Sequence, residues 1–200
     1  MGFEMSESVL FVCAQNVCRS PLMAAAFQEA LRAEGELGLG PSEWEVESVG
    51  TVASEGHRAC RIASGLEPAA ATHHSVRLEA DDLDVADIVI VASLDERSIV
   101  ARMRPQARSR TFTLREAVLL GEQPIDAGSI TEYAAALHSR RGTLDLPKPS
   151  SLPWRRGPEP LDVVDVHQMG PRAHRKGLER AAIDARLLAS RLRRDLAART

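Results

Sequence analysis

One stretch near the N-terminus places the strongest constraint on the fold, because it joins a buried strand, a short loop and a helix start. Residues 9–13 read Val-Leu-Phe-Val-Cys, an unbroken apolar run typical of a strand that is buried on both faces. Ser20 and Pro21 follow the loop, and these residue types are preferred at the N-cap and the first position of a helix. The stretch therefore predicts a strand, a tight loop and a helix that begins at about Pro21.

Apolar runs alternate with helical patterns along the rest of the chain. In chain order we expect strands at 9–13, 44–49, 86–92 and 109–114, and helices at 21–32, 55–66, 81–83, 95–103, 130–141 and 171–198, with a further helix starting near residue 115. Strands that alternate with helices build parallel sheets with right-handed crossovers. The fold class predicted is therefore a single-domain α/β protein with a four-stranded, doubly wound parallel sheet.

The length of 200 residues fits one domain spanning residues 1–200. Residues 1–7 are expected to form an N-terminal extension. The proline-rich residues 146–160 are expected to form a surface loop, because too little chain follows them to build a second domain.

Composition and charge exclude several classes of partner. The formal net charge of −3 gives no bulk attraction to nucleic acid or to an anionic membrane, and no apolar run approaches the length needed to span a bilayer. The N-terminus lacks the order of a signal peptide, so a cytoplasmic location is expected. Three cysteines form no disulfide framework, and neither their spacing nor that of the histidines matches a zinc site. We therefore expect no metal and no other cofactor.

The loop after the first strand has the chemistry of an oxyanion site. A strand, a tight loop and a helix N-terminus direct backbone N–H groups at one point, and the guanidinium of Arg19 suits phosphate oxygens. Cys13 lies at the mouth of this site, where a positive field favours its thiolate. The cradle is expected to consist of the backbone of Ala14, Gln15, Asn16, Val17, Cys18 and Arg19. A nucleophile aimed at a bound oxyanion indicates catalysis as well as binding.

The loop resembles the active-site loop of the low-molecular-weight protein tyrosine phosphatases, on the residues Cys13, Asn16, Cys18, Arg19, Ser20 and Pro21. Gln15 departs from the resemblance, because the family usually has glycine there. Residues 48–51, Ser-Val-Gly-Thr, resemble the turn that follows the second strand of the family. The resemblance implies hydrolysis of phosphomonoesters, above all phosphotyrosine in proteins, through a phosphocysteine intermediate on Cys13.

The resemblance also implies a general acid on a loop late in the chain, where the family has an Asp-Pro pair followed by aromatic residues. Asp165 is our first choice because it precedes the final helix, although Val166 replaces the proline. Asp162 is the competing candidate, and His167 could line the entrance in place of the missing aromatic residue. Tyr133 is the sole tyrosine, so the aromatic walls of a phosphotyrosine slot are not evident and the substrate could be a different phosphomonoester.

Supporting roles follow from the same resemblance. Asn16, Ser48 and His73 correspond to positions that brace the phosphate loop through hydrogen bonds. Ser20 is placed to donate a hydrogen bond to the sulfur of Cys13, besides its expected role as a helix cap. The family also implies that Cys18 forms a reversible disulfide with the nucleophile under oxidation, and packing at the helix start is the alternative.

Two alternatives to a phosphatase remain open from the sequence. Enzymes on this fold also reduce arsenate, and the kind that passes arsenate to a small thiol needs no further cysteine pair. A phosphoprotein-binding module without catalytic activity is the second alternative, and Gln15 and Val166 are the residues that favour it.

Overall fold

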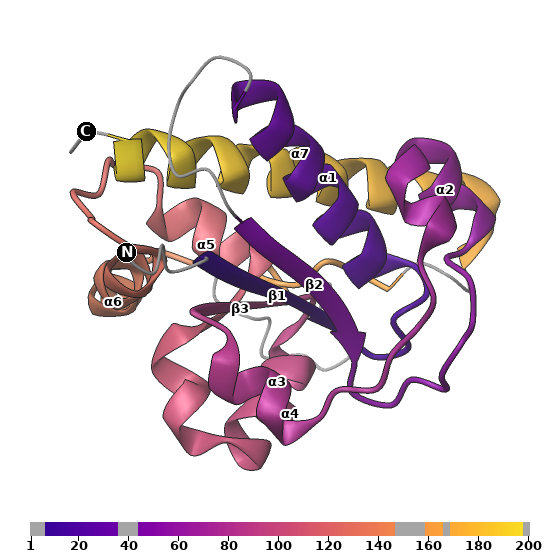
Figure 1. The fold of residues 1–200 in the computed structure, drawn as a ribbon, viewed down its shortest axis with the longest axis horizontal. Helices are drawn as coiled ribbons and strands as arrows, with labels where there is room; N and C mark the ends of the chain where they lie inside the picture. The colour runs from indigo at the N-terminus through magenta and orange to yellow at the C-terminus, as the bar shows by residue number, and fades with distance from the viewer. Residues whose placement is uncertain (1–6, 36–43, 147–158, 166–168, 198–200) are drawn as a thin grey trace, which may run out of the picture.

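The protein is described by a computed structural model that covers residues 7–35, 44–146, 159–165 and 169–197 and has an α/β architecture (Figure 1). In chain order its elements are β1 (Glu7–Cys13), α1 (Arg19–Gly35), β2 (Trp44–Gly50), α2 (Arg61–Leu66), the 3-10 helix η1 (Pro68–Thr72), α3 (Ala80–Val85), β3 (Ile88–Val91), α4 (Leu94–Met103), η2 (Pro105–Arg110), β4 (Thr111–Thr113), α5 (Leu114–Leu120), α6 (Ile130–Ser139), η3 (Arg141–Thr143) and α7 (Pro171–Ala197).

The sheet has four strands in the order β2-β1-β3-β4, and every neighbouring pair is parallel. The chain moves from β1 to one edge to form β2 and then to the other side of β1 to form β3. The winding therefore reverses at β1, and the loop that follows this strand lies at the position where doubly wound sheets bind ligands. The predicted fold class, including the loop after the first strand, is confirmed.

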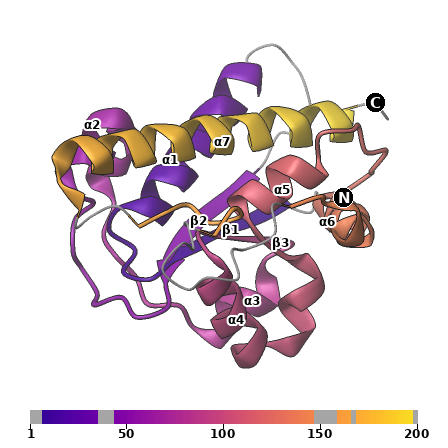
Figure 2. The ribbon, with the colours of Figure 1, turned by 180° about the vertical axis from the view of Figure 1, so that it is seen from behind.

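Both faces of the sheet are covered by helices. Helices α1 and α7 lie over one face, and α3 and α4 lie over the other (Figures 1 and 2). The side chains of β1 alternate accordingly: Val9, Phe11 and Cys13 belong to the core beneath α1 and α7, whereas Leu10 and Val12 belong to the core on the opposite face. This alternation directs the Cys13 side chain toward α1.

Several local predictions differ from the structure. The strand expected at 109–114 covers only Thr111–Thr113, because η2 ends at Arg110 and α5 begins at Leu114. The helix expected at 55–66 begins only at Arg61, because Cys60 is the N-cap of α2 and its backbone N–H donates to the carbonyl of Val17. Helix α1 begins at Arg19, so Ser20 lies inside the helix and its hydroxyl does not act as the expected N-cap. Glu7, assigned from the sequence to the extension, is the first residue of β1.

Several expectations lie wholly or partly outside the described residues. They concern the N-terminal residues 1–6, residues 147–158 of the proline-rich segment, and positions 166–168 beside the acid loop. In the part of the chain that is described, no helix combines the length and the apolar character that a bilayer crossing requires. The cytoplasmic location stays a prediction.

Candidate active site

Cys13 ends β1 and its sulfur lies against the first turn of α1. The Cys13 side chain is buried, with its Sγ 3.1 Å from Ser20 Oγ and 3.3 Å from the backbone nitrogen of Asn16, which donates to it. Ser20 Oγ also lies 3.2 Å from the carbonyl of Val49 and can donate its single proton to only one of these two partners. A Cys13 thiolate would draw that proton from Val49 to the sulfur, so the site can stabilise the anionic form with two donors.

Asn16 holds the loop in shape through its side chain. Its backbone φ of 53° is the only positive φ of a non-glycine residue in the described chain, and asparagine tolerates this left-handed conformation well. The Asn16 Nδ2 group donates to Ser20 Oγ at 2.8 Å and to Ser48 Oγ at 3.0 Å, while Oδ1 accepts from the Val76 amide at 2.8 Å. The Asn16 side chain therefore ties the loop to α1, to β2 and to the segment after η1.

His73 contacts the same residue from the other side. Its Nε2 lies 2.9 Å from the Asn16 carbonyl, and burial lowers the pKa of His73 below its ordinary value. The neutral ring is therefore favoured, with Nε2–H as the donor. The structure thus brings together all three residues expected to brace the loop, Asn16, Ser48 and His73; their effect on phosphate binding stays a prediction.

Gly50 lets the end of β2 approach the loop closely. A Cβ atom at this position would lie 2.7 Å from the carbonyl oxygen of Ala14 and 2.8 Å from the nitrogen of Asn16, both of them backbone atoms of the loop. Only glycine fits such a separation without a backbone shift. Gln15, by contrast, is exposed and has no positive φ, so the residue that replaces the family's usual glycine requires no strained backbone here.

Arg19 is held between two carboxylates. Its NH2 group lies 3.4 Å from Glu96 Oε1 and 3.1 Å from Asp165 Oδ2, and NH1 donates to the carbonyl of Val163 at 3.3 Å. Glu96 is buried in the first turn of α4, where it also accepts a hydrogen bond from Ser93. Sequence reasoning missed Glu96, because Ser-x-x-Glu at a helix start is fully explained as a capping pattern.

The two candidate acids have different surroundings. Asp165 is 60% exposed at the mouth of the site and contacts Arg19, whereas the Asp162 carboxylate accepts from the Leu94 amide at 2.9 Å, at the start of α4. Burial raises the pKa of Asp162, although its hydrogen bond from Leu94 acts in the opposite direction. Asp162 thus supports α4, and only Asp165 of the two faces the cavity.

The loop opens into a cavity of about 750 Å³. Its described lining comprises Cys13, Ala14, Gln15, Val17, Cys18, Arg19, Ser54, His57, Val164, Asp165, Met169, His174 and Leu178. The structure brings Cys13, Arg19 and Asp165 together in one cavity, and their catalytic roles stay predictions. Ser54, His57 and His174 were not predicted, because no local pattern marks them and only the folded chain brings them to the loop.

Cys18 faces a second cysteine. The hydrogen bond between the thiols of Cys18 and Cys60 raises the pKa of Cys18 and lowers the pKa of Cys60 to about 6. The backbone amides of Ala63 and Ile62 and the nearby His174 also favour the Cys60 thiolate. The disulfide between Cys13 and Cys18 that the resemblance implies stays a prediction, and Cys60 is a competing partner for Cys18.

Comparison with known proteins identifies the family to which this arrangement belongs. The sequence pattern of the family described as "Low molecular weight phosphotyrosine protein phosphatase" matches residues 8–122, which include the phosphate loop and, apart from Glu7, all four strands. The chain belongs to this family. It is accordingly a phosphatase of the low-molecular-weight type, and the resemblance drawn from the Cys13 loop is confirmed.

Two curated relatives are named for a substrate residue other than tyrosine. A protein-arginine-phosphatase from Geobacillus stearothermophilus is 34% identical over 120 residues, which cover 57% of this chain and 73% of the relative. A protein-arginine-phosphatase from Bacillus subtilis is 31% identical over 113 residues, covering 55% and 71% of the two chains. Specificity of this low-molecular-weight phosphatase for tyrosine therefore does not follow from its family.

Solved structures share the fold along most of the chain. A mutant of YwlE from Bacillus subtilis has a TM-score of 0.64 at 22% identity and covers 94% of this chain and 99% of that one. The tyrosine phosphatase Wzb from Escherichia coli, solved with sulphate, has a TM-score of 0.62 at 16% identity and covers 94% and 99%. These likenesses support the fold of this low-molecular-weight phosphatase and do not distinguish its substrate.

Proposed function

We propose that this phosphatase removes phosphoryl groups from protein side chains, with Cys13 as the nucleophile and Asp165 as the general acid. The observation that carries the proposal is that Cys13, Arg19 and Asp165 line the same cavity at the switch point of the sheet. The Cys13 sulfur has two hydrogen-bond donors within reach, Arg19 supplies a planar guanidinium, and Asp165 is exposed at the mouth. Nucleophile, anion cradle and acid are the three parts that such chemistry needs.

The reaction then has two steps. In the first, the Cys13 thiolate attacks phosphorus, an S–P bond forms, and the bond from phosphorus to the leaving atom breaks as Asp165 protonates that atom. In the second, the Asp165 carboxylate accepts a proton from water, the oxygen of that water attacks phosphorus, and the S–P bond breaks to give phosphate and the thiolate. Arg19 and the loop backbone stabilise the charge on the equatorial oxygens in both steps.

For the substrate we propose phosphoarginine in proteins ahead of phosphotyrosine. The two curated relatives are named protein-arginine phosphatases and share 31% and 34% identity with this chain. Among its described lining residues the cavity has no phenylalanine, tyrosine or tryptophan to stack on a phenol ring, whereas Asp165 offers a carboxylate at the mouth. A phosphorylated guanidino group carries several N–H donors in one plane, and the carboxyl oxygen of Asp165 that does not carry the catalytic proton can accept one of them.

Phosphotyrosine stays the second candidate, because the family as a whole is described as phosphotyrosine protein phosphatase. Val17 and Leu178 give the cavity apolar wall that a phenol ring could also contact. The two candidates differ in the leaving atom, nitrogen for phosphoarginine and oxygen for phosphotyrosine.

Two peptides of the same sequence, one carrying phosphoarginine and the other phosphotyrosine, separate the candidates. We expect kcat/KM to be at least about tenfold higher for the phosphoarginine peptide, which corresponds to ~1.4 kcal/mol of transition-state binding. A preference of that size for the phosphotyrosine peptide would overturn the proposal that phosphoarginine is the preferred substrate. Cys13→Ala should abolish turnover of both peptides, and activity retained in that variant would contradict the mechanism itself.

A further inference from the structure

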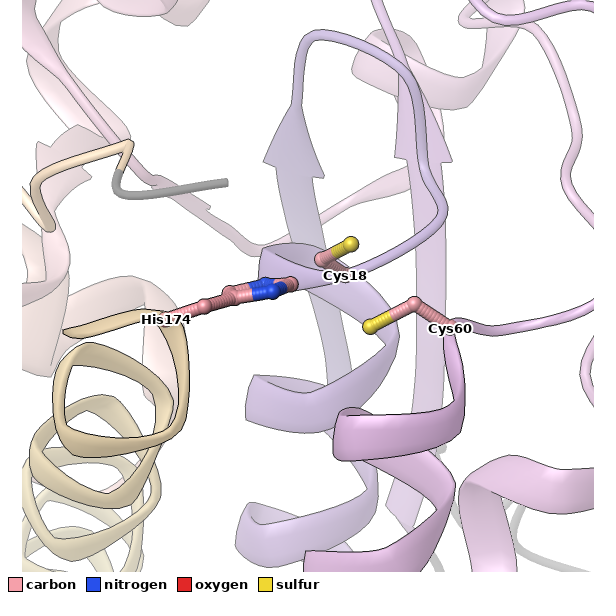
Figure 3. A group of neighbouring side chains, drawn as sticks. All are labelled: Cys18, Cys60 and His174. Atoms are coloured by element: carbon pink, nitrogen blue, oxygen red, sulfur yellow. The ribbon is translucent and has the colours of Figure 1, made fainter. Parts of the chain in front are cut away.

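Three side chains that are distant in sequence meet beside the phosphate loop. Cys18 comes from the loop, Cys60 caps the start of α2, and His174 lies near the start of α7. His174 and Cys60 approach Cys18 from opposite sides (Figure 3). One ligand-type atom of each residue, two sulfurs and an imidazole nitrogen, lies within 4.8 Å of the other two. His174 is buried and the two cysteines are half-buried, so the group forms part of the packed interior.

The set of donor atoms matches a particular class of ion. Thiolate sulfur and imidazole nitrogen are ligands of Zn²⁺ and related soft cations, whereas Mg²⁺ and Ca²⁺ prefer oxygen. Zinc–sulfur bonds of about 2.3 Å and zinc–nitrogen bonds of about 2.0–2.1 Å place tetrahedral ligand atoms roughly 3.4–3.8 Å apart. The observed limit of 4.8 Å means that a contraction of at most about 1.4 Å would bring all three atoms into range.

We propose that Cys18, Cys60 and His174 form a binding site for a thiophilic divalent cation of the zinc type. Zinc binds as the two cysteines release to solvent any proton that they still carry, so that two thiolates and one neutral imidazole coordinate the ion. No electron transfer takes place, and the cysteines stay reduced.

The backbone around these residues is held in place. The Cys60 amide donates to the Val17 carbonyl at 2.8 Å, which fixes the start of α2 against the phosphate loop. The His174 amide donates to the Gly170 carbonyl at 3.0 Å within the first turn of α7. Because two of the ligands are anchored on helices, little backbone ordering is needed to assemble the site.

The proposed metal site adjoins the catalytic cavity. Cys18 and His174 also line the 750 Å³ cavity that contains Cys13, so the fourth coordination position of a bound ion can be filled from that cavity. A bound ion would also link the phosphate loop to α2 and α7. The site thus places a metal ion in the wall of the catalytic cavity without using the nucleophile.

The test is a zinc titration of the full-length Cys13→Ser variant in the presence of a phosphine reductant. Removing the Cys13 sulfur excludes the nucleophile as a ligand, and the reductant keeps Cys18 and Cys60 as thiols. We expect one equivalent of Zn²⁺ to bind by calorimetry, and one equivalent of Co²⁺ to give the sulfur-to-cobalt charge-transfer absorption of a thiolate site. Mg²⁺ should not compete.

Two ligand variants and one control, all in the Cys13→Ser background, locate the site. Cys60→Ser keeps a good N-cap for α2 while removing a soft ligand, and His174→Ala removes the nitrogen. Each should weaken zinc binding by at least about 100-fold, since even outer-shell changes cost 10–100-fold. His57→Ala removes a histidine that lines the same cavity outside the cluster, and it should bind zinc like the parent. Unchanged binding in Cys60→Ser, or no binding in the folded parent, would overturn the proposal.

Discussion

The guanidinium of Arg19 lies 3.1 Å from the carboxylate of Asp165, although 146 positions separate the two residues in the chain. This contact joins the loop after the first strand to the segment that precedes the last helix. It places a carboxyl group at the mouth of the cavity that holds Cys13, which supports the proposal of Asp165 rather than Asp162 as the acid. The first predictions therefore concern this pair and its surroundings.

Asp165→Asn should lower kcat by roughly 10²–10⁴-fold at neutral pH on a substrate with a poor leaving group, because the leaving atom loses its proton donor. On an aryl phosphate whose leaving group needs little protonation, the loss in kcat/KM should be much smaller, because kcat/KM reports the first step and not the later activation of water by Asp165. Steady-state kinetics of the wild type and the variant on both kinds of substrate measure these losses. Near-wild-type turnover of the poor substrate would reject the assignment of Asp165.

Asp162→Asn is the matched control for that variant. The Asp162 carboxylate accepts from the Leu94 amide and does not line the cavity, so kcat should change by less than about threefold. A cost in stability of about 1 kcal/mol is expected from the weaker hydrogen bond at the start of α4. If this variant instead shows the larger loss of kcat on the poor substrate, Asp162 is the acid.

Glu96→Gln should weaken the positioning of Arg19. The buried carboxylate lies 3.4 Å from Arg19, and hydrogen bonds to charged groups contribute about 1.5–3 kcal/mol. We expect competitive inhibition by phosphate to weaken by about tenfold, with a similar fall in kcat/KM. Asp95→Asn makes the same change of charge at an exposed residue of the same helical turn, and equal effects in the two variants would contradict a specific role for Glu96.

Gly50→Ala should distort the phosphate loop. The added Cβ would lie 2.7 Å from the Ala14 carbonyl oxygen and 2.8 Å from the Asn16 nitrogen, so backbone must move. We expect a loss of about 1–3 kcal/mol in the free energy of unfolding, measured with urea, and weaker phosphate binding.

Gly65→Ala provides the comparison for Gly50. Nothing lies within 4 Å of a Cβ at this position, which is in helix α2 and has no positive φ. Alanine should therefore be neutral or stabilise the protein by up to about 1 kcal/mol. If Gly50→Ala were tolerated as well as Gly65→Ala, the close approach of β2 to the loop would not matter for stability.

The stability of the protein should fall in mildly acidic solution through His73. Burial lowers the pKa of His73 in the folded state, so the unfolded chain, whose histidine has a pKa near 6.5, takes up the proton first as the pH falls. The contribution of His73 is complete above about pH 6.5 and declines below it. Urea unfolding of the wild type and His73→Gln across pH 7.5 to 5.5 (roughly one unit either side of 6.5) measures this. A stability difference between them that does not shrink on acidification would contradict the expectation.

The parts of the site that lie within one short segment could be predicted from sequence. The buried run at 9–13, the loop and the start of α1 indicate Cys13 and Ser20 through local pattern, and the bracing role of Asn16 follows from the resemblance. Hydrogen bonds then connect these residues to Ser48 and His73, which were identified only through the resemblance.

Long-range contacts account for what the sequence did not reveal. Glu96 pairs with Arg19 across 77 positions, and a charge pair of that kind leaves no local signal. Cys18, Cys60 and His174 do not have the spacing of a known zinc motif. Their meeting in the fold could therefore not be predicted from the sequence. The helix expected from residue 55 begins at Arg61, because a hydrogen bond from Cys60 to Val17 outweighs helix propensity.

Rapid-quench kinetics with an aryl phosphate test the central claim, that Cys13 carries the phosphoryl group, most directly. We predict a burst of the aryl alcohol that approaches one equivalent per enzyme, together with an acid-quenched phosphoprotein whose label maps to Cys13 by mass spectrometry. Turnover without a trapped phosphocysteine, or a burst that persists in Cys13→Ala, would contradict the account.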